Sequence, residues 1–397
     1  MATRGIATFT LDYGHCPPWL FQRMVRLGRE MTYVLIDEYG PDEFIKRIAD
    51  PVWFQSLGTV LAFDWNASGL TTILTAALKE AIRGQEKDLG VFIAGGKGKT
   101  SRKTPDEIVQ WGERLNFNQD LSRQLVYSSK MAAKVDSSLV QDGYQIYHHA
   151  FFFSNPSADG GAWTVVQQGM NTSNVTARRY HWSDKINLDA NPACRQAGNF
   201  INEPHKGIAS QKFLSSVLNL TSKDSQKTRD VSTDLIHSGT KQLLKDLELL
   251  RSHQNSVSKM ISFKDPTDTY TFLKLEGVEF KHHDVELEDF NKSKYLDKIL
   301  TKVAEMSPKT YEQIVATEGV GPKTIRALSL VSEIIYGAKP SYEDPARYSF
   351  AHGGKDATPY PVDRKTYDQT IEVLKDAVSK TRLNYEEKSK AIARLSP

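Results

Sequence analysis

The chain has 397 residues, of which 39% are hydrophobic and 25% charged, and its formal net charge is +3. Such a composition is typical of a globular protein with two or three domains. It excludes a membrane-spanning protein, since no apolar run approaches the length of about 18 residues that a span needs. The mild net charge means that a surface for nucleic acid must come from local clusters of lysine and arginine. The two cysteines, Cys16 and Cys194, exclude a disulfide framework and a cysteine-based zinc site.

The first half of the chain combines helical and strand patterns. Apolar residues recur at helical spacing in four segments, at residues 19–39, 70–83, 105–115 and 120–138. Strand-like runs lie at residues 91–94, 144–153, 162–168 and 176–182. The connection at 155–161 is rich in turn residues, so the last three runs predict an antiparallel β-meander. We therefore expect an α+β fold, with a mixed N-terminal domain over residues 1–218.

A glycine-rich, basic run follows the first strand. Residues 95–103 read Gly-Gly-Lys-Gly-Lys-Thr-Ser-Arg-Lys. A P-loop would need a glycine five positions before Gly98, where Ile93 stands, so nucleotide hydrolysis is excluded. The basic residues of this run and of the helical pattern at 120–138 are candidate contacts to a nucleic-acid backbone. They are Lys97, Lys99, Arg102, Lys103, Lys130 and Lys134. For the run itself, a solvated loop is the alternative.

The meander strands carry pairs of neighbouring polar residues, whose members face opposite sides of the sheet. The pairs are His148 and His149, Gln167 and Gln168, and Arg178 and Arg179. On one face, a histidine and a glutamine can therefore lie together with either an arginine or His181. Such a face suits a catalytic centre, a nucleic-acid platform or a buried core. With Asp136 and Asp142 as the nearest carboxylates, a nuclease that uses Mg²⁺ or Mn²⁺ is one hypothesis.

The second half of the chain has a different organisation. Residues 219–234 are polar and lack apolar periodicity, which predicts a linker, and residues 235–397 predict an all-helical domain. Within it, residues 318–324 read Glu-Gly-Val-Gly-Pro-Lys-Thr between two helical patterns. Gly319 and Gly321 allow a tight turn with positive φ. The N–H groups that start the second helix, with Lys323 and Thr324, then make a site for one backbone phosphate.

This stretch resembles the helix-hairpin-helix motif of DNA repair and recombination proteins. With the later Val362-Asp363, the order of elements is also similar to the second half of the helix-hairpin-helix DNA glycosylases. That resemblance implies that Lys323 is the nucleophile that attacks the sugar C1′ and Asp363 its acid–base or charge-stabilising partner. An insert at 337–359 separates the two residues, and no four-cysteine cluster follows. The alternatives are a phosphate contact for Lys323 and a helix N-cap for Asp363.

Several short blocks of the sequence are distinctive, at residues 4–7, 14–17, 63–65, 95–99, 167–170, 177–182 and 348–355. Through these blocks the chain resembles, over nearly its whole length, an uncharacterised, largely archaeal family of the DUF763 type. The resemblance implies no particular activity, but it suggests that both halves of the chain act as one unit.

Three functional hypotheses follow. The first is a DNA repair enzyme, a glycosylase or abasic-site lyase that needs no cofactor and acts on duplex, damaged or branched DNA. The second is the metal-dependent, structure-specific nuclease with its centre in the N-terminal half. The third is a non-catalytic module that binds DNA or RNA. The N-terminus lacks a signal-peptide core, so we expect a cytoplasmic, nucleoid-associated protein with no membrane partner. The sequence leaves the oligomeric state open.

Overall fold

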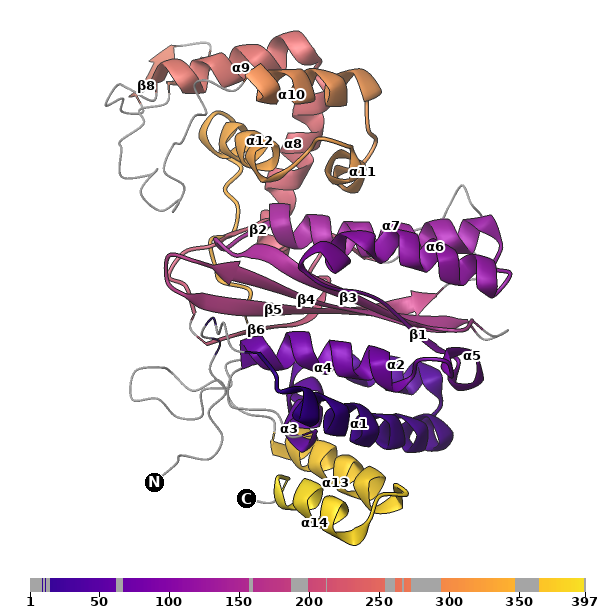
Figure 1. The fold of residues 1–397 in the computed structure, drawn as a ribbon. Coiled ribbons are helices and arrows are strands. Elements are labelled where there is room, and N and C mark those ends of the chain that lie inside the picture. The colour runs from indigo at the N-terminus through magenta and orange to yellow at the C-terminus, as the bar shows by residue number, and fades with distance from the viewer. Residues whose placement is uncertain are drawn as a thin grey trace.

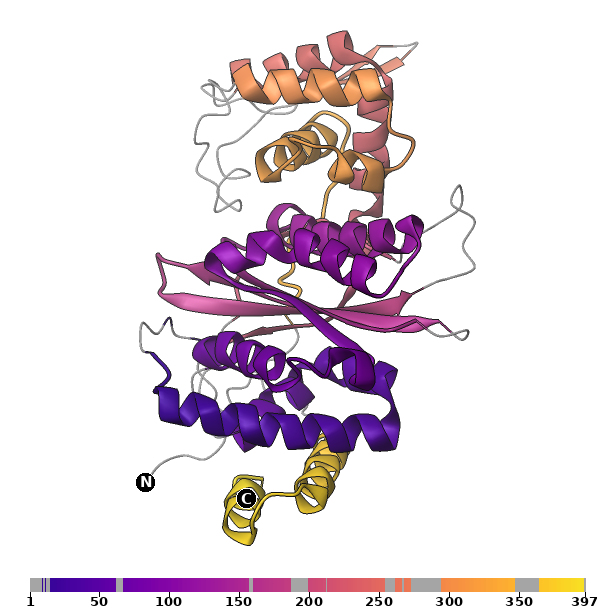
Figure 2. The ribbon, with the colours of Figure 1, turned by 45° about the vertical axis from the view of Figure 1, so that its right-hand side comes forward.

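The structure is a computed structural model in which a central antiparallel sheet lies between two helical layers, with further helices stacked beyond each layer (Figures 1 and 2). It describes residues 9, 11, 15–61, 67–156, 160–186, 199–211, 213–253, 261–265, 268–272, 294–346 and 364–395. The α+β character expected from the sequence is confirmed.

The central sheet has five strands in the order β1-β3-β4-β5-β6, each antiparallel to its neighbour. The strands are β1 (Val91–Lys97), β3 (Gln145–Ser154), β4 (Gly161–Asn171), β5 (Thr176–Ile186) and β6 (His205–Ser210). The predicted meander is confirmed as β3-β4-β5, and β1 adds to its edge beside β3. Two small ribbons complete the strands: β2 (Val140–Gln141) with β7 (Leu218–Asn219), and β8 (Ile261–Asp265) with β9 (Asp268–Phe272).

Helices cover both faces of this sheet, so the side chains on both faces belong to the hydrophobic core. One layer holds α1 (Pro18–Tyr39), α2 (Pro41–Ile48), α3 (Pro51–Val60) and α4 (Ala67–Ala81), and the short α5 (Glu86–Leu89) leads into β1. The other layer holds α6 (Thr104–Arg114) and α7 (Gln119–Ser138). Successive strand residues alternate between the layers, as Phe152 packs with the α1–α4 side chains and Phe151 and Phe153 with those of α6 and α7.

The C-terminal half contributes to both ends of the molecule. Five helices stack beyond α6 and α7: α8 (Gln226–His237), α9 (Thr240–His253), α10 (Lys294–Met306), α11 (Tyr311–Ala316) and α12 (Pro322–Ile334). Their apolar side chains belong to the same core as the α7 face of the sheet. The last helices, α13 (Arg364–Lys380) and α14 (Tyr385–Ala393), lie at the opposite end, where α13 packs on α1 and α3. None of the described helices combines the length and the apolar character that crossing a membrane requires.

The predicted linker at 219–234 is not an open linker, because α8 begins within it at Gln226. Apolar periodicity is missing there because polar side chains are buried and bonded. Arg229 is 1% exposed and donates hydrogen bonds to the carbonyls of Leu220 and Ser222, both at 2.7 Å. Buried Thr228 donates to the carbonyl of Ala338 at 2.7 Å. Residues that lack an apolar pattern therefore pack as part of the core.

Candidate nucleic-acid interface

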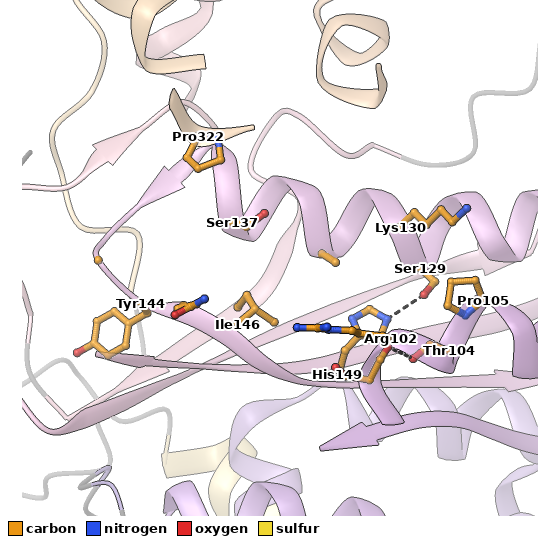
Figure 3. A pocket seen from close by; sticks show the side chains of 14 residues that line it. Arg102, Thr104, Pro105, Ser129, Lys130, Ser137, Tyr144, Ile146, His149 and Pro322 are labelled. Carbon is orange, nitrogen blue, oxygen red and sulfur yellow. Dashed lines mark hydrogen bonds between the residues drawn. The ribbon is translucent and has the colours of Figure 1, made fainter. Parts of the chain in front are cut away.

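The described part of the protein contains a groove of about 660 Å³ where the two halves of the chain meet (Figure 3). Its walls come from the 3₁₀ helix η1 (Gly98–Lys103), the first turn of α6, the second half of α7 and the start of β3. Pro322, the first residue of α12, completes the wall. The glycine-rich run and the start of α12, far apart in the sequence, therefore border one groove.

The charge around this groove is positive. Arg102 and Lys130 line it, and no aspartate or glutamate does so among the described residues. Lys97, Lys99 and Lys103 are exposed beside Arg102 on β1 and η1. The N-terminal ends of α6 and α12 also border the groove and add the positive ends of two helix dipoles. A polyanion is the class of ligand that this charge fits.

The turn at 317–321 joins α11 to α12, and only its first glycine is required by the backbone. Gly319 has φ +92°, and a Cβ there would lie 2.5 Å from Ile299 Cδ1. Gly321 is extended, with φ −146° and ψ −170°, and has open space around it. Lys323 is exposed at the start of α12, whereas Thr324 is buried. The turn thus presents Lys323 to solvent but keeps the Thr324 side chain in the core.

Two side chains of the N-terminal half hold this turn in place. Lys134 Nζ donates a hydrogen bond to the carbonyl of Thr317 at 2.5 Å, and Gln141 Nε2 donates to the carbonyl of Pro322 at 3.0 Å. Burial lowers the pKa of Lys134, and the nearby Glu318 acts in the opposite direction. Lys134 therefore secures the turn before α12, whereas Lys130, one turn earlier on α7, is exposed on the groove.

The glycine-rich run has a packing role at its first residue. Gly95 has φ +88°, and a Cβ there would lie 2.3 Å from both the carbonyl oxygen of His149 and Thr104 Oγ1. Glu107 accepts hydrogen bonds from the Gly95 N–H at 2.9 Å and from Lys79 at 2.6 Å. These contacts fix the end of β1, so the basic side chains that follow project from a rigid base.

The polar residues on the α7 face of the sheet form a connected network, which we call the Asp136 network. Ser129 Oγ lies 2.8 Å from His149 Nε2, and His149 Nδ1 lies 2.8 Å from Gln167 Oε1. Gln167 Nε2 donates to Asp136 Oδ2 at 2.5 Å. Trp182 Nε1 donates to the same oxygen, and His205 Nε2 bonds Asp136 Oδ1 at 2.5 Å. Burial raises the pKa of Asp136, while His205 and the three hydrogen bonds act to lower it. Burial also lowers the pKa of His149 to about 4.

The opposite face of the sheet carries the other members of the pairs. His148, Gln168 and Arg179 lie side by side across β3, β4 and β5, which confirms that one face holds a histidine, a glutamine and an arginine together. All three are completely buried beneath α3 and α4, as is His181. Burial lowers the pKa of His148 to about 3 and that of Arg179 to about 9, and it lowers the pKa of His181 well below its usual value.

Arg178 links the sheet to the segment after α12. Its guanidinium bonds Asp344 through two nitrogens, at 2.9 and 2.8 Å, and Asp142 Oδ2 at 3.0 Å. Tyr180 also donates to Asp142, at 2.6 Å. Arg178 and Asp142 are fully covered, so the ion pairs are shielded from solvent. Burial raises the pKa of Asp142, and Arg178 acts to lower it.

The two predicted metal carboxylates do not fit a divalent cation. Asp136 and Asp142 each accept hydrogen bonds from three N–H or O–H groups, and these occupy the oxygens that a metal would use. Across the described ranges, no three His, Cys, Asp or Glu side chains gather as a metal ion would require.

The candidate residues of the sequence thus separate into two groups. The exposed ones lie on or beside the groove: Lys97, Lys99, Arg102, Lys103, Lys130 and Lys323. The meander residues are interior, and among them His149 also lines the groove. Asp363, with the blocks at 4–7, 63–65 and 348–355, lies outside the described residues. Sequence reasoning missed Ser129, although it stands two helical turns before Asp136 and so shares its face of α7.

Comparison with known proteins identifies the family of this chain. A family model described as "Protein of unknown function (DUF763)" matches residues 5–362. The chain belongs to this family. No curated protein and no solved structure matches it. The matched range includes η1, α7, β3 and the start of α12, so every wall of the groove lies within the family's shared region.

Proposed function

We propose that this member of the DUF763 family binds DNA along the groove between η1, α7 and the N-terminus of α12. One observation carries the proposal: two basic stretches, each of which suits backbone phosphates, border a single groove that Arg102 and Lys130 line without a carboxylate. Phosphate contacts supply most of the electrostatic affinity for DNA, and lysines, arginines and helix N-termini are the groups that make them. The resemblance of residues 318–324 to DNA-binding hairpins favours DNA over RNA.

Within this proposal, Lys323 is a phosphate contact. Schiff-base chemistry uses an amine that its surroundings desolvate, and Lys323 is exposed. The abasic-site lyase reaction through Lys323 and Asp363 is a separate hypothesis. Borohydride trapping of the protein on abasic DNA in EDTA tests it, since only an imine between the enzyme and the sugar is trapped.

The experiment is fluorescence anisotropy with a labelled duplex, repeated over a series of salt concentrations. Each phosphate contact contributes about 0.9 to the slope of log K against log salt, so Arg102→Ala with Lys130→Ala should reduce that slope by about 2. Arg26→Ala is the matched control, because Arg26 is an exposed arginine on α1, on the far side of the sheet. An unchanged slope in the double variant, or an equal loss in the control, would refute the groove as the binding surface. Tighter binding to single-stranded RNA of the same length would refute DNA as the ligand.

A further inference from the structure

We infer that Ser129 is a nucleophile toward a DNA phosphodiester held in the groove, with His149 as its general base. This inference rests on the proposed function and adds to it a reaction that needs no metal ion. It is carried by the hydrogen bonds of the Asp136 network together with the position of Ser129 and His149 on the groove.

The network fixes which nitrogen of His149 carries the proton. Trp182 Nε1–H can only donate, so Asp136 Oδ2 accepts, and it accepts from Gln167 Nε2 as well. The amide of Gln167 therefore turns Oε1, which can only accept, toward His149 Nδ1. Nδ1 must then be the protonated nitrogen, which leaves a lone pair on Nε2. Ser129 Oγ–H donates to that lone pair at 2.8 Å. A serine hydroxyl, a histidine in this tautomer and a group that orients it form the arrangement of an activated serine.

Ser129 and His149 form part of the groove's floor. Both line the groove, and Figure 3 shows them facing each other from α7 and β3 beneath the hollow that Pro322 and Lys130 border. Ser129 is 2% exposed and His149 5%, so the pair is shielded from bulk water yet in contact with the groove.

The groove also supplies what the transition state of phosphoryl transfer needs. The attacked phosphorus gains negative charge on its oxygens, and fixed cations nearby stabilise that charge. Arg102 and Lys130 line the same groove as Ser129, and no carboxylate does so among the described residues. A phosphodiester is therefore favoured over a neutral ester or a cationic substrate.

The reaction balances with water as the proton donor to the leaving group. Ser129 Oγ attacks phosphorus while its proton passes to His149 Nε2. The P–O bond to one nucleoside oxygen breaks on the side opposite Ser129, because the attacking and leaving oxygens lie in line. That oxygen takes a proton from water, and the hydroxide left behind takes the proton from His149. The product is a phosphoserine ester linked to one DNA end and a free hydroxyl on the other. Reversal of the step reseals the strand, and attack by water releases a phosphate end and restores the serine.

The test uses two kinds of probe on the full chain in EDTA. Diisopropyl fluorophosphate should add its phosphoryl group to Ser129 and release fluoride, as intact-mass and peptide analysis would show. Two duplexes, one with the bridging phosphorothiolate sulfur at the 5′ position and one with it at the 3′ position, cover both possible leaving groups. One of them should give an SDS-resistant adduct between protein and DNA, because the sulfur leaves and cannot reseal the strand.

Variants separate a nucleophile from a structural serine. Ser129→Ala should abolish both adducts, and His149→Asn should slow both at least tenfold, while the Kd for intact duplex stays within twofold. Gln167→Leu, which removes the group that fixes the tautomer, should lower the labelling rate and leave the Kd unchanged. Ser137→Ala is the matched control, because Ser137 lines the same groove and bonds the carbonyl of Lys134 instead of a histidine. It should behave as wild type.

Each possible result of these experiments bears on a different claim. DNA binding without either adduct, or adducts that persist in Ser129→Ala, would overturn the nucleophile and leave the proposed function standing. Labelling of Ser129 by the fluorophosphate without a DNA adduct would overturn the phosphodiester as substrate. Absence of DNA binding would overturn the proposed function and, with it, this inference.

Discussion

The buried histidines make the stability of this protein depend on pH, and His148 allows the effect to be calculated. His148 is completely buried, its Nε2 lies 3.1 Å from Thr75 Oγ1, and burial lowers its pKa from 6.5 to about 3. The folded protein therefore keeps His148 neutral at pH 5, whereas the unfolded chain protonates it below about pH 6.5. The contribution of neutral His148 to the free energy of unfolding is fully present above pH 6.5. It is lost as the pH falls toward the pKa of His148 in the folded protein. Each pH unit is worth about 1.4 kcal/mol for one group, so the loss between pH 6.5 and pH 5 is about 2 kcal/mol.

The assay is urea unfolding of the wild type and of His148→Gln at pH 7 and pH 5. The substitution removes one titrating group, so the variant should lose about 2 kcal/mol less than the wild type between the two pH values. The raised pKa values of Asp136 and Asp142 act in the opposite sense, but these carboxyls are present in both proteins and cancel in the comparison. An equal loss in the two proteins would refute the claim that His148 is neutral in the fold.

Three further predictions concern the C-terminal half. Gly319→Ala should lower the free energy of unfolding by about 1–3 kcal/mol, because the residue has positive φ and its Cβ would strike Ile299, whereas Gly321→Ala should change it by less than about 0.5 kcal/mol. Asp344→Ala should cost about 3 kcal/mol in urea unfolding, because it removes one carboxylate from a buried arginine; a loss below about 1 kcal/mol would contradict that view. Lys323→Ala should weaken DNA binding and reduce the salt slope by about 0.9. If borohydride trapping on abasic DNA occurs and disappears in this variant, Lys323 is instead a nucleophile.

The strands of the N-terminal half could be predicted, but not what covers them. Alternation and turn residues located the meander to within a few residues, and the opposite orientation of His148 and His149 followed from strand geometry. A single strand pattern does not show whether a helix lies over each face. Since α4 and α7 cover the two faces, residues predicted as a surface platform, such as Gln168 and Arg179, are buried.

The hydrogen-bond partners of the polar residues could not be predicted from the sequence either. The sequence pointed to Asp136 and His149 as neighbours in a site, but the group between them is the amide of Gln167. Ser129, which lines the groove together with His149, was not predicted. Likewise, Thr104 and Glu107 have the spacing of a helix capping box, in which the glutamate would bond the backbone at the helix start. In the structure, Glu107 instead accepts hydrogen bonds from the Gly95 N–H and from Lys79. Such choices depend on tertiary contacts, which local patterns do not encode.

The measurement that tests the central claim most directly is crosslinking to a duplex that carries 4-thiothymidine, followed by peptide mapping. If one groove formed by both halves holds the DNA, crosslinked peptides should come from η1, from the Ser129–Lys130 region of α7 and from the start of α12. All three should disappear together when Arg102 and Lys130 are replaced by alanine. Crosslinks confined to the start of α12, or spread over α1 and α13 on the far side of the sheet, would contradict the account.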